Sequence, residues 1–280
     1  KKISDYITKK VADKLSGMCK TDRENYEKYW DDINPFIKFG CLKDEKFDEK
    51  MKDYILYKNL DGKYLTLADC LEENKEKHEN KIFYVTDEKE QSQYINMFKA
   101  NGQDAIIMSH SIDNPFISQE EQKHENLKFL RIDADVNDTL REEVKEEDKE
   151  ALKKQEETLT ETFKKALGDD KLQVKVEKLK DAEISSMITL SEETRRMQDM
   201  MKMYNMGMDA SMFGGSGQVL VLNANNKLVQ YVLEHTDGEN TPKICEQLYD
   251  LAQLSHGSLT PERMTKFIAR SNEIMGMMLN

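Results

Sequence analysis

The sequence lacks a long hydrophobic run, and no eighteen consecutive apolar residues occur among its 280 residues. A helix needs about that length to cross a bilayer, so no membrane span is predicted. Cysteine is also scarce: the chain has Cys19, Cys41, Cys70 and Cys245, far apart and without a CxxC pair. Scattered free thiols fit a reducing compartment better than a disulfide framework, which predicts a cytoplasmic protein.

Positive charge is in short supply, with 42 Lys and Arg against 54 Asp and Glu, a net charge of −12. An acidic chain repels phosphate, so nucleic acid and anionic membranes are disfavoured as partners. The length predicts about two domains with hydrophobic cores. The chain starts at Lys1 within a helical pattern and without a methionine, so we expect a fragment of a longer protein.

Motifs that carry catalysis are missing as well. There is no GxxxxGK[ST], no GxGxxG after a strand, no GxSxG and no HExxH. The five histidines lack metal-ligand spacing, and the glycine-rich segment 213–217 precedes a strand instead of opening a helix. Asp87 and Asp113 follow predicted strands, where ligands often bind, but have no convergent partner. We therefore expect no catalytic residue, no metal and no cofactor in this chain, and an enzyme is the least favoured class.

Residues 1–136 are expected to form a first domain. Its segment 1–75 shows helical periodicity, with a capping box at Thr21 and Glu24 and interruptions at Asn34-Pro35 and Gly40. Within 81–117, the short apolar runs KIFYVTD and DAIIMSH flank a helical pattern, which predicts a βαβ unit with parallel, buried strands. We expect Phe116-Ile117 to be an exposed apolar pair and residues 118–137 to be irregular.

Residues 137–280 are expected to form a second, mixed α+β domain that ends in a helical bundle. A long charged helix is predicted from Asp138 or Thr139 to Gly168. Alternating segments predict a strand within 172–179, a neighbouring strand over 184–190 and a third strand over 218–223, followed by a helix over 226–237. The fold class is therefore α+β or α/β.

The last forty residues form the pattern of two amphipathic helices. Thr241-Pro242 and Thr260-Pro261 each place a capping residue before a proline at the first helical position. Two apolar helices at a chain end suggest a partner, and we expect a second copy of this chain. The predicted dimer seam consists of the apolar positions Ile244, Leu248, Leu251, Leu254, Phe267, Ile268 and Ile274.

A methionine cluster precedes these helices, since eight of the sixteen methionines lie between Met187 and Met212. Met197, Met200, Met201 and Tyr204 are spaced three and four apart, on one helical face. Methionine is flexible and frequent on promiscuous binding surfaces. Two interpretations stay open: a plastic helix packed in its own core, or an exposed face for varied apolar partners.

The order of several motifs resembles the heat-shock protein 90 chaperones. The segments YEKYWDDINPFIKFG, LTLADCLEENKEKHENKIFYVT and DAIIMSHSID are similar to the end of the middle domain of that family. The segments VEKLKDAEISSMITL and VLVLNANNKLV, with the final helices, are similar to its C-terminal dimerization domain. The chain ends without the acidic tail of cytosolic eukaryotic members, so it looks like a bacterial-type member.

The resemblance implies the back portion of an ATP-driven homodimeric chaperone that acts in protein folding and stress response. ATP and Mg²⁺ would bind upstream of this chain, which would itself not hydrolyse ATP. Partly folded clients would be the partners. The client contacts of bacterial members carry over to Phe116, Met200, Met203 and Tyr204, and the helical face adds Met197 and Met201. The alternative from another class is a purely structural dimerization module, with the methionine helix buried.

Overall fold

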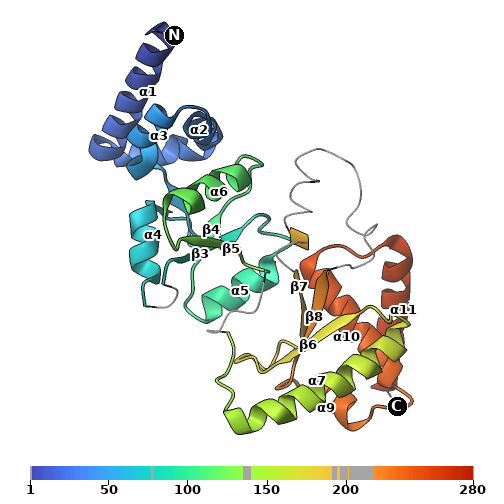
Figure 1. The fold of residues 1–280 in the computed structure, drawn as a ribbon. Coiled ribbons are helices and arrows are strands. Elements are labelled where there is room, and N and C mark those ends of the chain that lie inside the picture. The colour runs from blue at the N-terminus through green and yellow to red at the C-terminus, as the bar shows by residue number, and fades with distance from the viewer. Residues whose placement is uncertain are drawn as a thin grey trace. The chain divides into compact units, whose positions relative to one another are not determined.

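The computed structural model describes residues 2–76, 79–134, 140–190, 194–195, 201 and 217–279. The chain divides into two compact units. Unit 1 comprises Lys1–Glu88 and Phe98–Ile132, and unit 2 comprises Lys89–Met97 and Asp133–Asn280. Each unit combines helices with a three-stranded sheet, so the predicted α+β class is confirmed (Figure 1). The assignment of residues 1–136 and 137–280 to two family domains stays a prediction.

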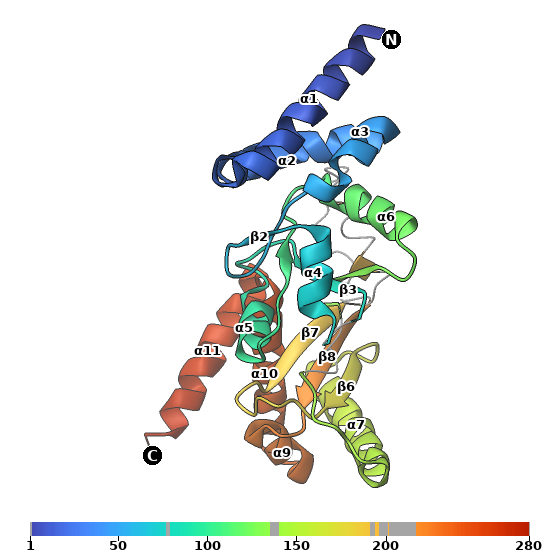
Figure 2. The same ribbon diagram turned by 90° about the vertical axis from the view of Figure 1, so that its left-hand side faces the viewer.

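Unit 1 begins with three packed helices, which Figures 1 and 2 show in blue. They are α1 (Lys2–Thr21), α2 (Arg23–Lys43) and α3 (Glu45–Met51), and the 3₁₀ turn η1 (Lys52–Tyr54) follows. Tyr26 and Trp30 of α2 lie in a core with Phe47 and Met51 of α3. The predicted helical character of this segment is therefore confirmed.

Helix α2 runs through Asn34-Pro35 and Gly40, where an interruption was predicted. Proline has no N–H for the carbonyl four residues before it, here that of Asp31. The buried Asn34 side chain supplies the missing donor, since its Nδ2 lies 3.1 Å from the Asp31 carbonyl and 3.0 Å from that of Trp30. At Gly40 a Cβ would lie 2.8 Å from Cε1 of Phe47, so glycine allows α3 to pack closely.

The predicted capping box at Thr21 and Glu24 is wrong. The Thr21 hydroxyl donates to the Gly17 carbonyl within α1 at 2.8 Å. Asp22 is the N-cap residue of α2, without a side-chain capping bond. The Thr21 side chain therefore bonds to the last turn of α1 and does not cap α2, which begins two residues later.

The βαβ prediction for residues 81–117 is confirmed. Strands β3 (Lys81–Val85) and β4 (Ile106–Ile107) pair in parallel, with α5 (Ser92–Ala100) between them in sequence. The irregular segment predicted over 118–137 contains, in its described part, the end of α6 (Asp113–Lys123) and strand β5 (Lys128–Arg131), so that prediction is wrong there. Strand β5 pairs in parallel with β3, which gives the order β4-β3-β5.

Smaller elements precede this sheet. Strands β1 (Tyr57–Lys58) and β2 (Tyr64–Leu65) form an antiparallel pair. Helix α4 (Leu67–Asn74) then begins with a capping box, in which Thr66 and Asp69 satisfy each other's backbone N–H groups. This hydrogen bonding lowers the pKa of the Asp69 carboxyl. Helix α4 packs against β3.

The sheet of unit 2 is mixed. Its strands are β6 (Gln173–Glu177), β7 (Ser186–Leu190) and β8 (Gln218–Asn223), in the order β6-β8-β7. Strand β8 is parallel to β6 and antiparallel to β7. The three strands are confirmed, but the prediction that the first two are neighbours is wrong because β8 lies between them.

The side chain of Asn223 joins the backbone around this sheet. Its Oδ1 accepts from the N–H groups of Leu179 and Asn225, both at 3.0 Å. Its Nδ2 donates to the carbonyls of Asp181 at 2.9 Å and Ile184 at 2.7 Å. One fully buried amide therefore fixes both ends of the connection between β6 and β7.

Among the described residues from 140 onward, the helices beside the sheet of unit 2 are α7 (Glu146–Leu167), α9 (Lys227–Glu234), α10 (Thr241–His256) and α11 (Pro261–Met277). Residues of α7, α9 and α10 share one core with alternate residues of the strands. Helix α7 ends at Gly168 as predicted, where φ is +62°. It begins later than predicted, because residues 140–142 are extended and pair with the segment that follows β6.

All four cysteines are free, as their spacing predicts, and all four are buried. Burial raises the pKa of Cys70 and of Cys245 to about 12 and also raises the pKa of Cys19 and of Cys41. The native thiols are therefore almost entirely protonated at neutral pH. Across the described ranges, no helix has the length and apolar character that a membrane crossing requires.

Candidate functional site

Helices α10 and α11 are locked together by a buried ionic network. The Arg270 guanidinium donates to Glu246 Oε2 at 2.7 Å, to Gln247 Oε1 at 2.9 Å and to Asp250 Oδ2. Arg263 holds the other oxygen of Asp250 at 2.5 Å. Both Arg270 and Asp250 are almost completely buried, so the pair fixes the angle and register between the two helices.

A cavity of about 240 Å³ lies beside this network, between the end of α7 and helices α10 and α11. Its wall includes three cations and three carboxylates, and most of these charges neutralise one another through the contacts just described. Arg263 also lies over the Tyr249 ring, with Cζ 4.7 Å from the ring centroid. The arrangement is that of a structural clamp, with no nucleophile poised beside a base.

The face of α11 turned away from this clamp is apolar and exposed. Ile268 and Met275 are seven residues apart and lie on the same face, 53% and 56% exposed. Leu251 of α10 is also exposed, at 41%. Of the other predicted seam residues, Ile244, Leu254, Phe267 and Ile274 are half-buried within the protomer. Met275 was not predicted on this face, and Met277 and Leu279, which are also exposed near the end of the chain, were not predicted as exposed.

The placement of Leu248 in the seam is corrected by the structure. Leu248 is 1% exposed and packs in the core of unit 2 with Cys245, Ala252 and residues of the sheet. The helical periodicity of α10 identified its apolar face correctly, but that face is covered by the protomer's own sheet. A charge at Leu248 would therefore disrupt the core itself and is unsuitable as a test of dimerization.

The predicted client residues of the methionine cluster lie mostly outside the described residues. This applies to Met197, Met200, Met203 and Tyr204. Met201 is described; it is helical and half-buried. Whether this face is a core helix or an exposed surface stays open, and the assignment of these residues to client binding stays a prediction.

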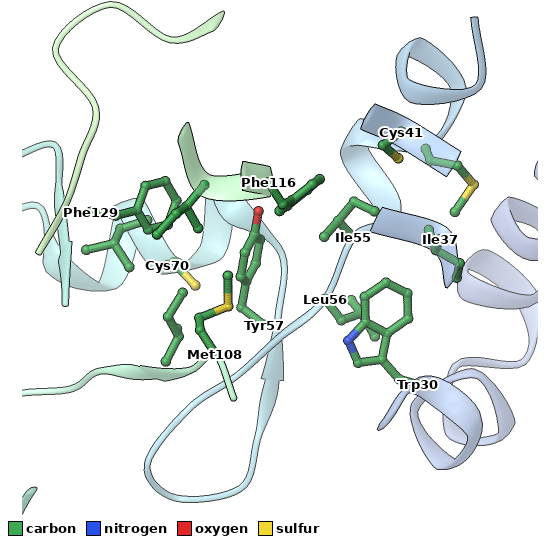
Figure 3. Packing of buried hydrophobic residues seen from close by; sticks show 14 of the residues in the cluster. Trp30, Ile37, Cys41, Ile55, Leu56, Tyr57, Cys70, Met108, Phe116 and Phe129 are labelled. Atoms are coloured by element: carbon green, nitrogen blue, oxygen red, sulfur yellow. The ribbon is translucent and has the colours of Figure 1, made fainter. Parts of the chain in front are cut away.

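The expected exposure of Phe116 is wrong. Phe116 and Ile117 lie on the buried side of α6, and Phe116 is fully covered. Figure 3 shows its ring directed toward Ile55, beside the hydroxyl of Tyr57. Since Asn114-Pro115 begins a helix instead of ending a unit, the two following apolar residues turn into the core. A surface for apolar ligands that needs Phe116 would require this core to open.

Asp113 has a structural partner that the sequence did not reveal. Its carboxylate forms an ion pair with Lys38 of α2, with Nζ 2.5 Å from Oδ1, and accepts from the His110 N–H at 2.9 Å. The side chains of Lys38 and Asp113 are only 4% and 2% exposed. Among the residues that the structure describes, no three His, Cys, Asp or Glu side chains are grouped to hold a metal ion.

Three aromatic side chains on α2 form a second exposed surface, which was not predicted from the sequence. Tyr29, Phe36 and Phe39 are 47%, 77% and 53% exposed. Their neighbours Tyr26, Trp30 and Ile37 occupy the buried side of the same helix. The signal was present in the intervals of seven and three residues, which place the exposed rings on one face.

Comparison with known proteins gives a consistent result over the whole chain. Residues 1–280 match the family described as "Hsp90 protein". The chain is 35% identical over 256 residues to "Chaperone protein HtpG" of Bacteroides thetaiotaomicron, which covers 87% of this chain and 37% of that protein. It is 32% identical to the protein of that name from Porphyromonas gingivalis, covering 91% of this chain and 38% of that protein. The chain thus spans less than two fifths of the length of these relatives.

Proposed function

The chain belongs to the Hsp90 family, and from this we propose that it serves as the dimerization and client-holding part of a bacterial-type molecular chaperone. The proposed activity is binding alone. Nucleotide and Mg²⁺ would act in other parts of the longer protein, and no residue of this chain is assigned a catalytic role. The proposed location is the cytoplasm.

The observation that carries the proposal is the exposed apolar face of α10 and α11. Leu251, Ile268 and Met275 project from helices whose mutual geometry is fixed by the Arg270 network. A rigid apolar face can associate with a copy of itself without a large ordering cost. A two-fold dimer through this face would bring two pairs of helices into one bundle and should bury at least about 1,200 Å² in total.

Dimerization is expected to be abolished by Leu251→Asp combined with Ile268→Asp. Both side chains are exposed in the protomer, so the charges should leave the fold intact but would be desolvated in a dimer seam. Light scattering should give about twice the 32.7 kDa chain mass for the native protein and the single mass for the variant.

Leu228→Asp is the matched control, because Leu228 is 48% exposed on α9 and is not one of the proposed seam residues. This variant should remain a dimer. A native protein that is monomeric at all concentrations, or a double variant that keeps the dimer mass, would contradict the proposed seam.

Client holding is proposed for the methionine-rich face that includes Met200, Met203 and Tyr204. Met200→Asp combined with Tyr204→Ala should abolish the suppression of aggregation of a heat-denatured test protein, because a charge and a truncation remove its apolar contacts. Light scattering by the aggregating protein is the readout. Full suppression by a correctly folded double variant would rule out this face.

The alternative is a structural dimerization module without client binding of its own. Hydrogen exchange of residues 191–213 separates the two functions. Slow exchange, comparable to that of the sheet of unit 2, would favour the structural module, and fast exchange would favour an accessible client face.

A further inference from the structure

The exposed aromatic side chains of α2 are not required by the core beneath them. Tyr29, Phe36 and Phe39 are exposed, while Tyr26 and Trp30 pack on the buried side of the helix. We call the three exposed residues the α2 aromatic stripe. Large aromatic rings grouped on a rigid helix are typical of protein-contact surfaces, because they bury much area at little cost in side-chain entropy.

Cations flank this stripe at both ends. Lys28 Nζ lies 5.9 Å from the centroid of the Tyr29 ring, and Lys43 Nζ lies 5.7 Å from that of Phe39. Asp32 is exposed on the same face, between them in sequence. Along the stripe the charges are therefore positive at Lys28, negative at Asp32 and positive at Lys43, in a chain whose net charge is −12.

The other carboxylates along α2 do not change this pattern. Asp31 points to another side of the helix, where it accepts from Lys58 Nζ at 2.9 Å. Glu27 is held by Arg23 at 2.7 Å. Glu24 is exposed in the first turn, one helical turn before Lys28, so it lies beyond the cationic end of the stripe and outside the span of the three rings.

We propose that the α2 aromatic stripe is a docking site for an amphipathic helical segment of a partner polypeptide that is apolar in its middle and acidic near both ends. Lys28 and Lys43 are fifteen residues apart, or ~22 Å along the helix at 1.5 Å per residue. About four turns of a partner helix span the same distance, so both lysines can meet carboxylates while the rings contact its apolar face. Asp32 disfavours a carboxylate at the centre of the partner.

Two fluorescein-labelled peptides of sixteen residues test the proposal. Both have the same apolar face and composition; one has Glu at its ends and Lys at its centre, and the other has the charges exchanged. Measured by fluorescence anisotropy at low salt, the acid-ended peptide should bind on the order of tenfold more tightly. Phe36→Ser combined with Phe39→Ser should weaken its binding by at least about tenfold.

Charge reversal supplies the decisive comparison. The variant Lys28→Glu, Asp32→Lys, Lys43→Glu should invert the preference between the two peptides, because only the charge pattern has changed. Tyr231→Ser, which removes an exposed ring on α9, should leave both affinities unchanged. The fluorescence of Trp30, buried behind the stripe, reports that each variant is folded.

Equal affinities of the native chain for the two peptides would overturn the proposal. Binding that survives the loss of both phenylalanines would do the same. The proposal would also be overturned if the native chain self-associates and the Phe36→Ser, Phe39→Ser variant does not. The occupant of the stripe would then be a second copy of the chain. The dimer-seam variant Leu251→Asp, Ile268→Asp should bind the acid-ended peptide normally, so failure of the proposed dimer would be distinguishable.

Discussion

Replacing Arg270 by methionine is expected to destabilise unit 2 by about 3 kcal/mol and to weaken the proposed dimer. The methionine cannot replace the guanidinium contacts to Glu246, Gln247 and Asp250. Asp250 is almost completely buried and would keep only Arg263, whose own side chain is 39% exposed. A buried carboxylate that loses one partner carries a desolvation cost that its remaining contacts do not offset. Helix α11 would lose its fixed register on α10 and with it the rigid apolar face.

Cys245 provides the measurement, because it is the one cysteine of unit 2 and is fully buried in α10. Its raised pKa of about 12 and its burial protect the native thiol, so its labelling in increasing urea reports unfolding of unit 2. The labelling midpoint of Arg270→Met should fall markedly. Lys243→Met is the matched control, because the pair between Lys243 and Glu273 joins the same helices at 2.6 Å but is exposed. Equal midpoints for the two variants would show that the buried network contributes little.

Replacing Lys38 by methionine is expected to destabilise unit 1 by about 3–5 kcal/mol. The variant leaves the Asp113 carboxylate buried without its ion pair at 2.5 Å, with the His110 N–H at 2.9 Å and the His110 ring, whose Nδ1 lies 3.8 Å from Oδ2, as its remaining neighbours. Breaking a buried pair on one side is far more costly than removing both charges. The variant should therefore loosen the packing of α6 on α2, which this pair joins.

Trp30 is the chain's single tryptophan and lies in the core of unit 1, so its fluorescence in urea measures this effect. Lys38→Met combined with Asp113→Asn should recover at least about half of the loss, because the amide oxygen still accepts from His110 and no charge remains. Lys58→Met removes an exposed pair with Asp31 and should shift the midpoint little. A double variant less stable than Lys38→Met would contradict the desolvation explanation.

The sequence predicted where the helices and strands lie better than it predicted which of their faces are buried. Alternation identified β6, β7 and β8, and short apolar runs identified β3 and β4, because each strand carries its own pattern. Strand β5 was missed because KFLR begins and ends with a charged residue. The position of β8 between β6 and β7 depends on pairing across the chain, which no local pattern specifies.

The errors at Phe116 and Leu248 have different physical causes. At Leu248, periodicity shows which face of the helix is apolar, but it does not show whether the protomer or a partner covers that face. At Phe116, the Asn114-Pro115 pair was read as the end of an element, whereas it lies in the first turn of α6 and the following residues turn into the core. The partners of Lys38 and Arg270 were hidden for a related reason: charged residues on helices usually face solvent, and only tertiary structure shows when they are buried in pairs.

The strand orders of the two sheets have a consequence during synthesis on the ribosome. In unit 1 the central strand β3 is made first, so β4 and β5 can each pair with it as they emerge. In unit 2 the central strand β8 is made last, and Asn223 at its end follows Leu190 of β7 by thirty-three residues. At roughly 5–20 residues per second, the backbone edges of β7 stay unpaired with β8 for ~2–7 s, and those of β6, which is made earlier, for longer. During that interval the nascent chain itself presents the kind of exposed segment that chaperones protect.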